Sequence, residues 1–238
     1  MSLPPPVAFY YGWPGQVNGA AGDLPRALRS FAGYDCVVLG EGNVLPGADP
    51  TVPELVPLLA PRAWGYVDLG CSHGSRNWSM PQLVCLARAW RALGAAGVLF
   101  DCAGSDFGVS RRRFIDAVAA AHELGLSVIA NAWRPADILS GASPLGPDDG
   151  YLGENLLLSE GRWLDAAGVR TKLRVMLEGR CRLGVRLLAT ATAPVGRIRE
   201  ARLLERVERA LAPYELDGLA ITDPRYSASN NRLAPPPT

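Results

Sequence analysis

The sequence predicts a single (β/α)₈ barrel, in which eight strand–helix units close into a ring. Short apolar runs of strand type alternate with amphipathic runs of helical period along almost all of the 238 residues. Eight strand runs with short connections match the count that this fold requires. The length and the 48% content of hydrophobic residues suit one larger α/β domain over residues 1–238. We expect residues 1–6 and 233–238 to be flexible tails.

The predicted strands are short runs rich in valine, leucine, isoleucine and aromatic residues, which favour the pleated conformation. Several are bounded by glycine or followed by a polar residue, as at Asp68 and Asp101. In chain order the strands are expected at residues 7–11, 36–39, 64–68, 97–101, 126–131, 150–154, 185–189 and 218–222.

The predicted helices repeat apolar residues at three- and four-residue spacing, and several have start or stop signals. Ser110 is a suitable N-cap for the fourth helix, and Gly125 ends it. The helices are expected at residues 24–31, 53–59, 81–93, 111–124, 135–139, 163–183 and 197–211. No amphipathic run follows the last strand, so we expect the barrel to lack its last outer helix.

Two other α/β readings fit the sequence less well. A doubly wound sheet should carry a GxGxxG phosphate loop after its first strand, and Gly12-Trp13-Pro14-Gly15 lacks that spacing. A phosphate-binding barrel enzyme needs a glycine-rich anion nest after strand seven or eight. Residues 192–196 and 223–225 do not provide one.

The charge balance argues against nucleic acid and anionic membranes as partners. The 24 basic and 23 acidic residues give a formal net charge of +1, whereas such partners need a cationic excess. No apolar run reaches the roughly 18–20 residues of a membrane span. The first six residues lack the regions of a secretory signal. We therefore expect a cytoplasmic protein, or one exported by another route, and leave the oligomeric state open. Lys172 is the only lysine, which we attribute to coding bias.

Cysteine and histidine usage predicts neither a metal site nor a cofactor. The five cysteines are widely spaced and form no CxxC pair, so we expect five unpaired thiols. His73 and His122 are too few for a multi-histidine centre, and His122 falls on a predicted helix surface.

Polar and aromatic residues gather where the predicted strands end, which is where barrels of this kind place their catalytic groups. Alternation along the strands puts Asp101 on the side of Leu99, and Asn131 on that of Ile129. Glu154 likewise points to the same side as Leu152. All three side chains can therefore point into the barrel at the ends of their strands. The full set comprises the carboxylates Glu41, Asp68, Asp101, Glu154 and Asp223, the aromatic residues Tyr10, Tyr11, Trp13, Trp133 and Tyr226, and Asn131.

Two carboxylates beside aromatic rings are typical of glycoside hydrolysis, because one carboxyl group protonates the leaving oxygen while the other attacks or activates water. The alternative is that a strand-end carboxylate binds loop amides. That alternative stays open for Glu41 and Asp68 and is preferred for Asp106. Trp64 and Trp90 are expected to be packing residues.

Several stretches resemble one set of barrel enzymes. Residues 97–108, which run Gly-Val-Leu-Phe-Asp-Cys-Ala-Gly-Ser-Asp-Phe-Gly, resemble the strand-four signature of the endo-α-1,4-polygalactosaminidase-like glycosidases and their spherulin-4-like relatives. Further similarity lies in Tyr10-Tyr11, in residues 64–70, in Asn131-Ala132-Trp133 and in residues 151–154. The resemblance implies that Asp101 and Glu154 are the catalytic pair. Some relatives have Asp-Glu at strand four, where this chain has Asp101-Cys102.

We therefore expect a hydrolase that cleaves an amino-sugar-containing polysaccharide without a metal or cofactor. Glu154 would be the general acid/base, and Asp101 the nucleophile or the base that positions water. The other strand-end residues would bind substrate: Tyr10, Tyr11, Trp13, Glu41, Asp68, Asn131, Trp133, Asp223 and Tyr226. The alternative is a non-catalytic carbohydrate-binding barrel of a surface or phage-tail assembly.

The five strand-end carboxylates also predict an acidic cleft, which would prefer a polymer with free amino groups. Arg76, Arg134 and Arg225 are expected at the rim. If those arginines instead fold inward and pair with the carboxylates, the groove would be neutral.

Overall fold

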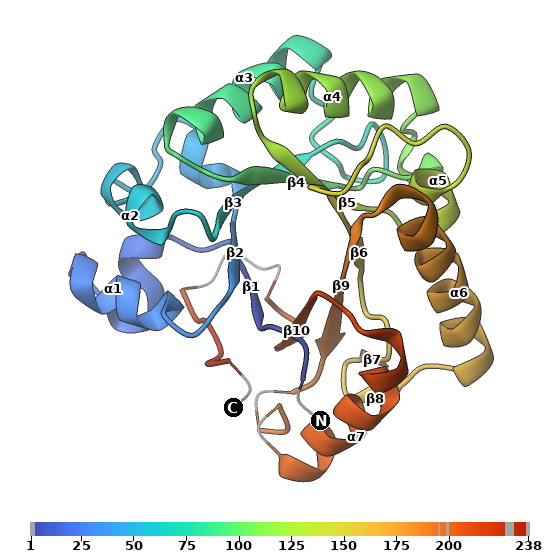
Figure 1. Cartoon of the computed structure of the whole chain (residues 1–238). Coiled ribbons are helices and arrows are strands. Elements are labelled where there is room, and N and C mark those ends of the chain that lie inside the picture. The colour runs from blue at the N-terminus through green and yellow to red at the C-terminus, as the bar shows by residue number, and fades with distance from the viewer. Residues whose placement is uncertain (1–2, 195, 199, 227–230, 237–238) are drawn as a thin grey trace.

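The computed structural model confirms the barrel. It describes residues 3–194, 196–198, 200–226 and 231–236, and within these ranges eight parallel strands form one sheet in the order β1-β2-β3-β4-β5-β6-β9-β10. Leu219 N donates to Pro5 O at 2.9 Å, so the last strand meets the start of the first and the ring closes (Figure 1). The strands are β1 (Val7–Tyr10), β2 (Cys36–Leu39), β3 (Ala63–Asp68), β4 (Gly97–Asp101), β5 (Ser127–Asn131), β6 (Gly150–Gly153), β9 (Arg186–Thr192) and β10 (Gly218–Thr222).

The helices lie outside this ring of strands (Figure 1). Their starts follow the sequence signals: Ser110 accepts from Arg113 N at 3.1 Å, and Ser79 forms a capping box with Gln82. They are α1 (Leu24–Phe31), α2 (Val52–Leu59), α3 (Met80–Ala92), α4 (Arg111–Glu123), α5 (Pro135–Leu139), α6 (Ala166–Leu183) and α7 (Ala201–Leu211). None of these helices is long and apolar enough to cross a membrane.

Alternate residues of each strand supply two separate apolar layers. The residues inside the barrel are Val7, Phe9, Val38, Trp64, Leu99, Ile129, Leu152, Leu188 and Ala220. Their strand neighbours, such as Val98 and Phe100, pack against the helices. Trp90 of α3 is fully buried, and a Cβ on Gly65 would come within 2.1 Å of its ring, so only glycine fits there. Trp64 and Trp90 are thus packing residues. Leu99, Ile129 and Leu152 point into the barrel, which agrees with the inward direction expected for Asp101, Asn131 and Glu154.

A short hairpin between β6 and α6 differs from the prediction. Residues 163–183 were expected to form one helix, but Trp163 belongs to β8 (Arg162–Trp163), which pairs with β7 (Leu158–Ser159). The turn residues Glu160 and Gly161 have φ of 52° and 80°, which is typical of a two-residue hairpin loop. α6 then begins after Asp165, whose side chain accepts from Gly168 N at 2.7 Å.

The described part of the C-terminal segment, where a flexible tail was expected, contacts the rest of the chain. Residues 223–226 and 231–236 contain no helix, and the last six contact residues on either side of α1. Leu233 exchanges two hydrogen bonds with the Asn18 side chain, and Ala234 O accepts from the Tyr34 hydroxyl. Residues 1–2 and 237–238 lie outside the described residues.

All five cysteines are free thiols. Cys85 and Cys181 are exposed on helices, while Cys36, Cys71 and Cys102 are half-buried at or beside strands.

The C-terminal segment should contribute to stability, because Leu233 is only 8% exposed and packs on the core. We predict that Leu233→Ala lowers the free energy of unfolding by about 2 kcal/mol, through lost burial and the cavity it leaves. Leu58→Ala is the matched control, since Leu58 is 58% exposed on α2. Thermal or denaturant unfolding of the two variants measures the difference, and equal stability of both would show that the segment does not hold the fold.

Candidate active site

The carboxyl ends of the central strands bring two carboxylates together. Asn131, at the end of β5, donates from Nδ2 to Asp101 Oδ1 at 2.8 Å and to Glu154 Oε2 at 3.3 Å. An amide nitrogen carries two hydrogens, so it can serve both acceptors. The two accepting oxygens therefore lie at most about 6 Å apart. This places the predicted catalytic pair in one polar cluster, which we call the carboxylate cluster: Tyr66, Asp101, Asn131, Glu154 and Tyr226.

Asp101 lies at the end of β4 with three donors around it. The Tyr66 hydroxyl donates to Oδ2 at 2.8 Å, and the backbone N of Cys102 donates to Oδ1 at 2.8 Å. Cys102 adopts φ +53° as the chain turns out of the strand at this point. These bonds and that of Asn131 favour the carboxylate form, whereas burial and the nearby Glu154 charge oppose it. Burial and repulsion outweigh the donors and raise the pKa of Asp101 to about 6.

Glu154 follows β6 and is bound by a residue from beyond β10, two strands further round the ring. The Tyr226 hydroxyl donates to its Oε1 at 2.5 Å. The next residue, Asn155, donates its backbone N–H to Thr190 Oγ1 at 2.8 Å and accepts from Thr192 Oγ1 at 2.9 Å. Both threonines are buried in β9, which fixes the loop that carries Glu154.

Aromatic rings line the same end of the barrel. Tyr11 packs against Tyr66 and Tyr226, with ring centroids 5.0 Å and 6.3 Å apart. Burial, aided by the neighbouring carboxylates, raises the pKa of all three hydroxyls, so they remain protonated donors. Trp13 and Trp133 are 53% and 65% exposed at the ends of β1 and β5. Exposed indole faces of this kind offer flat apolar surfaces to a ligand.

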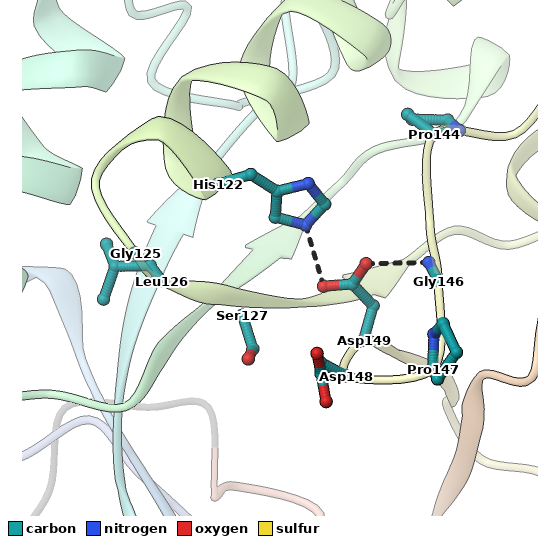
Figure 2. Close-up of a pocket in the computed structure, with 9 residues that line it drawn as sticks. All are labelled: His122, Gly125, Leu126, Ser127, Pro144, Gly146, Pro147, Asp148 and Asp149. Carbon is teal, nitrogen blue, oxygen red and sulfur yellow. Dashed lines mark hydrogen bonds and ion pairs between the residues drawn. The ribbon is translucent and has the colours of Figure 1, made fainter.

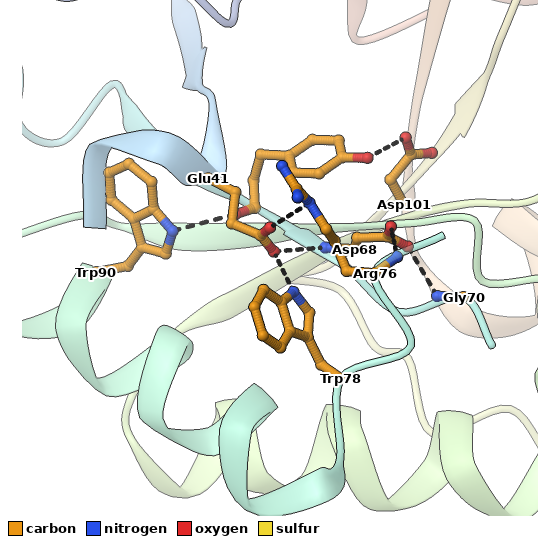
Figure 3. A network of polar contacts seen from close by, with 8 residues as sticks. Glu41, Asp68, Gly70, Arg76, Trp78, Trp90 and Asp101 are labelled. Atoms are coloured by element: carbon orange, nitrogen blue, oxygen red, sulfur yellow. Dashed lines mark hydrogen bonds and ion pairs between the residues drawn. The ribbon is translucent and has the colours of Figure 1, made fainter. Parts of the chain in front are cut away.

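Glu41 and Asp68 bind a loop and do not join the carboxylate cluster. Glu41 accepts from Trp78 Nε1 at 2.9 Å and from the backbone N of Asp68 at 3.2 Å (Figure 3). Asp68 in turn accepts from the backbone N of Gly70 at 2.9 Å and of Arg76 at 2.7 Å. Both carboxylates are 6% exposed. They hold the loop between β3 and α3, which is the loop-binding alternative that the sequence left open.

Tyr10 lies apart from the carboxylate cluster, and the Asp223 side chain binds the loop that follows β10. Because Phe9 points into the barrel, Tyr10 points to the helices, where it packs on Phe31 at 5.5 Å and is 1% exposed. Asp223 accepts from Arg225 N at 2.8 Å and lies 3.5 Å from Arg225 Nε. Tyr10 is therefore not placed as the substrate-binding residue that the sequence analysis expected, whereas Asp223 stays a prediction.

The uniformly acidic cleft is likewise not observed. Arg76 Nε lies 3.7 Å from Glu41 Oε2, and Arg225 pairs with Asp223, so two of the three expected rim arginines turn toward carboxylates. Arg134, the third, precedes α5 and is exposed.

Four residues of this end were missed by sequence reasoning. Tyr66 shares its strand side with Trp64 and Asp68, which was a usable signal. Thr190 and Thr192 continue the inward side of Leu188, but only once the seventh strand is extended beyond residue 189. Lys172 of α6 donates from Nζ to Glu154 O at 3.2 Å, although its uniqueness in the sequence was given no weight.

A hollow of about 400 Å³ lies at the opposite end of the barrel, where the strands begin (Figure 2). Its wall includes His122, whose Nε2 lies 3.0 Å from Asp149 Oδ1. Asp149 is 3% exposed and accepts from the backbone N of Val128 and of Gly146 at 2.8 and 2.9 Å. These bonds hold the start of β5 and the turn before β6, so we assign this pair a structural role.

Comparisons with known proteins show the fold. Neither a protein-family model nor a curated protein matches the sequence. Among solved structures, the glycoside hydrolase domain of PelA from Pseudomonas aeruginosa is 17% identical with a TM-score of 0.63, over 95% of this chain and 98% of that chain. The citrate lyase β subunit from M. tuberculosis, complexed with oxaloacetate and magnesium, is 15% identical with a TM-score of 0.54, over 94% and 93%. At these identities the likeness establishes a shared architecture.

The raised pKa of Asp101 predicts a pH-dependent effect on stability. Its folded pKa of about 6 exceeds the ordinary value of 3.8, so its contribution to stability is present below about pH 4 and lost as the pH rises through about 6. Asn cannot ionise, so the Asp101→Asn variant does not lose this stability as the pH rises. We predict that the free energy of unfolding of the variant, relative to wild type, increases between pH 4 and pH 7.5. Denaturant unfolding at both pH values measures it, and a constant difference would contradict the assignment.

Proposed function

We propose that this barrel is a glycoside hydrolase that cleaves an amino-sugar-containing polysaccharide with the carboxyl groups of Asp101 and Glu154. The observation that carries the proposal is the single Asn131 amide that bridges the two, next to exposed indole rings. Its architecture is similar to that of the PelA glycoside hydrolase domain, which supports the reaction class. The amino-sugar substrate rests on the sequence resemblance to polygalactosaminidase-like enzymes.

In this proposal Asp101 is the nucleophile. Tyr66, Asn131 and the Cys102 amide orient its carboxylate, which is charged above about pH 6. The pair reacts in the form that holds a single proton, with that proton on Glu154 and the charge on Asp101. The Asp101 carboxylate attacks the anomeric carbon and forms a glycosyl ester, while Glu154 donates its proton to the leaving oxygen. Glu154 then takes a proton from water, which hydrolyses the ester and frees Asp101.

The distance between the two carboxyl groups favours this direct attack. Inverting enzymes hold their carboxyl groups about 6.5–9.5 Å apart to admit a water, and retaining enzymes about 5–5.5 Å. The two oxygens that Asn131 bridges, Asp101 Oδ1 and Glu154 Oε2, lie at most about 6 Å apart, which is closer to the retaining separation than to most of the inverting range. We therefore propose that the configuration at the anomeric carbon is retained.

A carbohydrate-binding barrel without turnover is the second candidate. The exposed rings of Trp13 and Trp133 would serve binding equally well, and Cys102 stands where some related enzymes have a second carboxylate. Activity of the matched carboxyl variants separates the two candidates.

We predict that Asp101→Asn and Glu154→Gln each remain folded and lose at least about a hundredfold in turnover, because each removes one of the two reacting carboxyl groups. Wild-type turnover should also fall as the pH drops below about 6, where Asp101 becomes protonated. Reducing-end release from amino-sugar polysaccharides measures both effects. Asp116→Asn on the outer helix α4 is the control and should be fully active. Undiminished activity of either carboxyl variant would remove that residue from the mechanism, and binding without turnover by wild type would establish the second candidate.

We also predict that the first product has the anomeric configuration of the substrate bond. Time-resolved proton NMR of the released reducing end, recorded before mutarotation, distinguishes the two anomers. Initial appearance of the opposite anomer would show inversion and would assign Asp101 to water activation.

A further inference from the structure

Lys172 lies between the proposed acid/base and an exposed indole ring. Its Nζ donates to Glu154 O at 3.2 Å and is 5.6 Å from the centroid of the Trp133 ring. The residue is half-buried in α6, so its position is set by packing as well as by charge. Every other basic residue, apart from the two histidines, is an arginine. This end of the barrel therefore carries the sequence's one lysine side chain, with its compact ammonium group.

The ammonium has hydrogen-bonding capacity left over. It has three N–H donors, and within the described part of the chain the Glu154 carbonyl is the one acceptor bonded to Nζ. Two donors are therefore available to solvent or to a ligand. Burial lowers the pKa of Lys172, while the Glu154 charge opposes this shift and favours the ammonium form.

The position of this charge matters for an amino sugar. A sugar ring stacked on Trp133 would share that indole with Nζ, so its substituents come within the distance at which charges are weakly screened. An acetamido group presents a carbonyl oxygen that can accept from Nζ. A free amino group is itself an ammonium at neutral pH and would be repelled.

We propose, on the premise of the hydrolase function above, that Lys172 selects an N-acetylated over a free amino sugar at the subsite formed by Trp133 and Glu154. This reverses the preference for free amino groups that the sequence suggested. Two of the carboxylates behind that expectation pair with arginines, and Asp68 is bound by backbone amides.

The test compares α-1,4-linked galactosamine oligosaccharides in fully N-acetylated and fully deacetylated forms. Both are assayed with wild type, Lys172→Met and Lys172→Arg for turnover and, by calorimetry, for binding. Methionine keeps an unbranched stem without charge, and arginine keeps the charge. Arg174→Met is the matched control, because it removes a positive charge from the same helix at a residue paired with Glu178.

Wild type should prefer the acetylated form, and Lys172→Met should reduce that preference about tenfold or more, as the loss of one close charge–charge interaction predicts. Lys172→Arg should retain most of the preference, and Arg174→Met all of it. An unchanged ratio in a folded Lys172→Met would overturn the proposal, as would a wild-type preference for the deacetylated form.

The binding arm separates this proposal from the proposed function. If wild type binds the acetylated form more tightly without cleaving it, and Lys172→Met loses that preference, the role of Lys172 stands while hydrolysis fails. If wild type neither binds nor cleaves either form, both proposals fail.

Discussion

The amide of Asn131 connects the two carboxyl groups on which the rest of this site depends. Bringing Asp101 and Glu154 to about 6 Å inside a half-buried mouth costs free energy through desolvation and mutual repulsion. The donors that offset this cost come from separate strands: Tyr66 from β3, Asn131 from β5 and Tyr226 from beyond β10. They converge only when the ring is closed, so closing the barrel and assembling the site are the same event.

Much of this arrangement could be predicted from sequence, because alternation along a strand fixes which side chains point inward. Eight strand runs predicted the ring, and counting two residues forward from Leu99, Ile129 and Leu152 gave Asp101, Asn131 and Glu154. The same count argued against Tyr10, since its neighbour Phe9 occupies the inward side. Tyr10 was included because it lies near a strand end, although the alternation of side chains along the strand argued against it.

What could not be predicted depends on loops that local patterns do not specify. Glu41 and Asp68 sit at strand ends like Asp101, but the Arg76–Trp78 stretch folds back over them and supplies the donors. Lys172 was missed because a helical sequence pattern does not indicate which loop each side chain of the helix contacts. The β7–β8 hairpin delays the start of α6 to Ala166, and Lys172 then contacts the loop after β6.

The kind of donor separates the structural carboxylates of this barrel from the proposed catalytic pair. Asp49, Asp68 and Asp149 each accept from backbone N–H groups of a loop or strand, which no ligand can displace without unfolding that segment. Asp101 and Glu154 accept mainly from the side chains of Tyr66, Asn131 and Tyr226, which can rotate toward a sugar hydroxyl. Donors on side chains can change partners by rotation, so Asp101 keeps one fixed bond, from the Cys102 amide, and its other two donors can turn away. Strand-end position makes a carboxylate available, and its donors then decide whether it serves the fold or the chemistry.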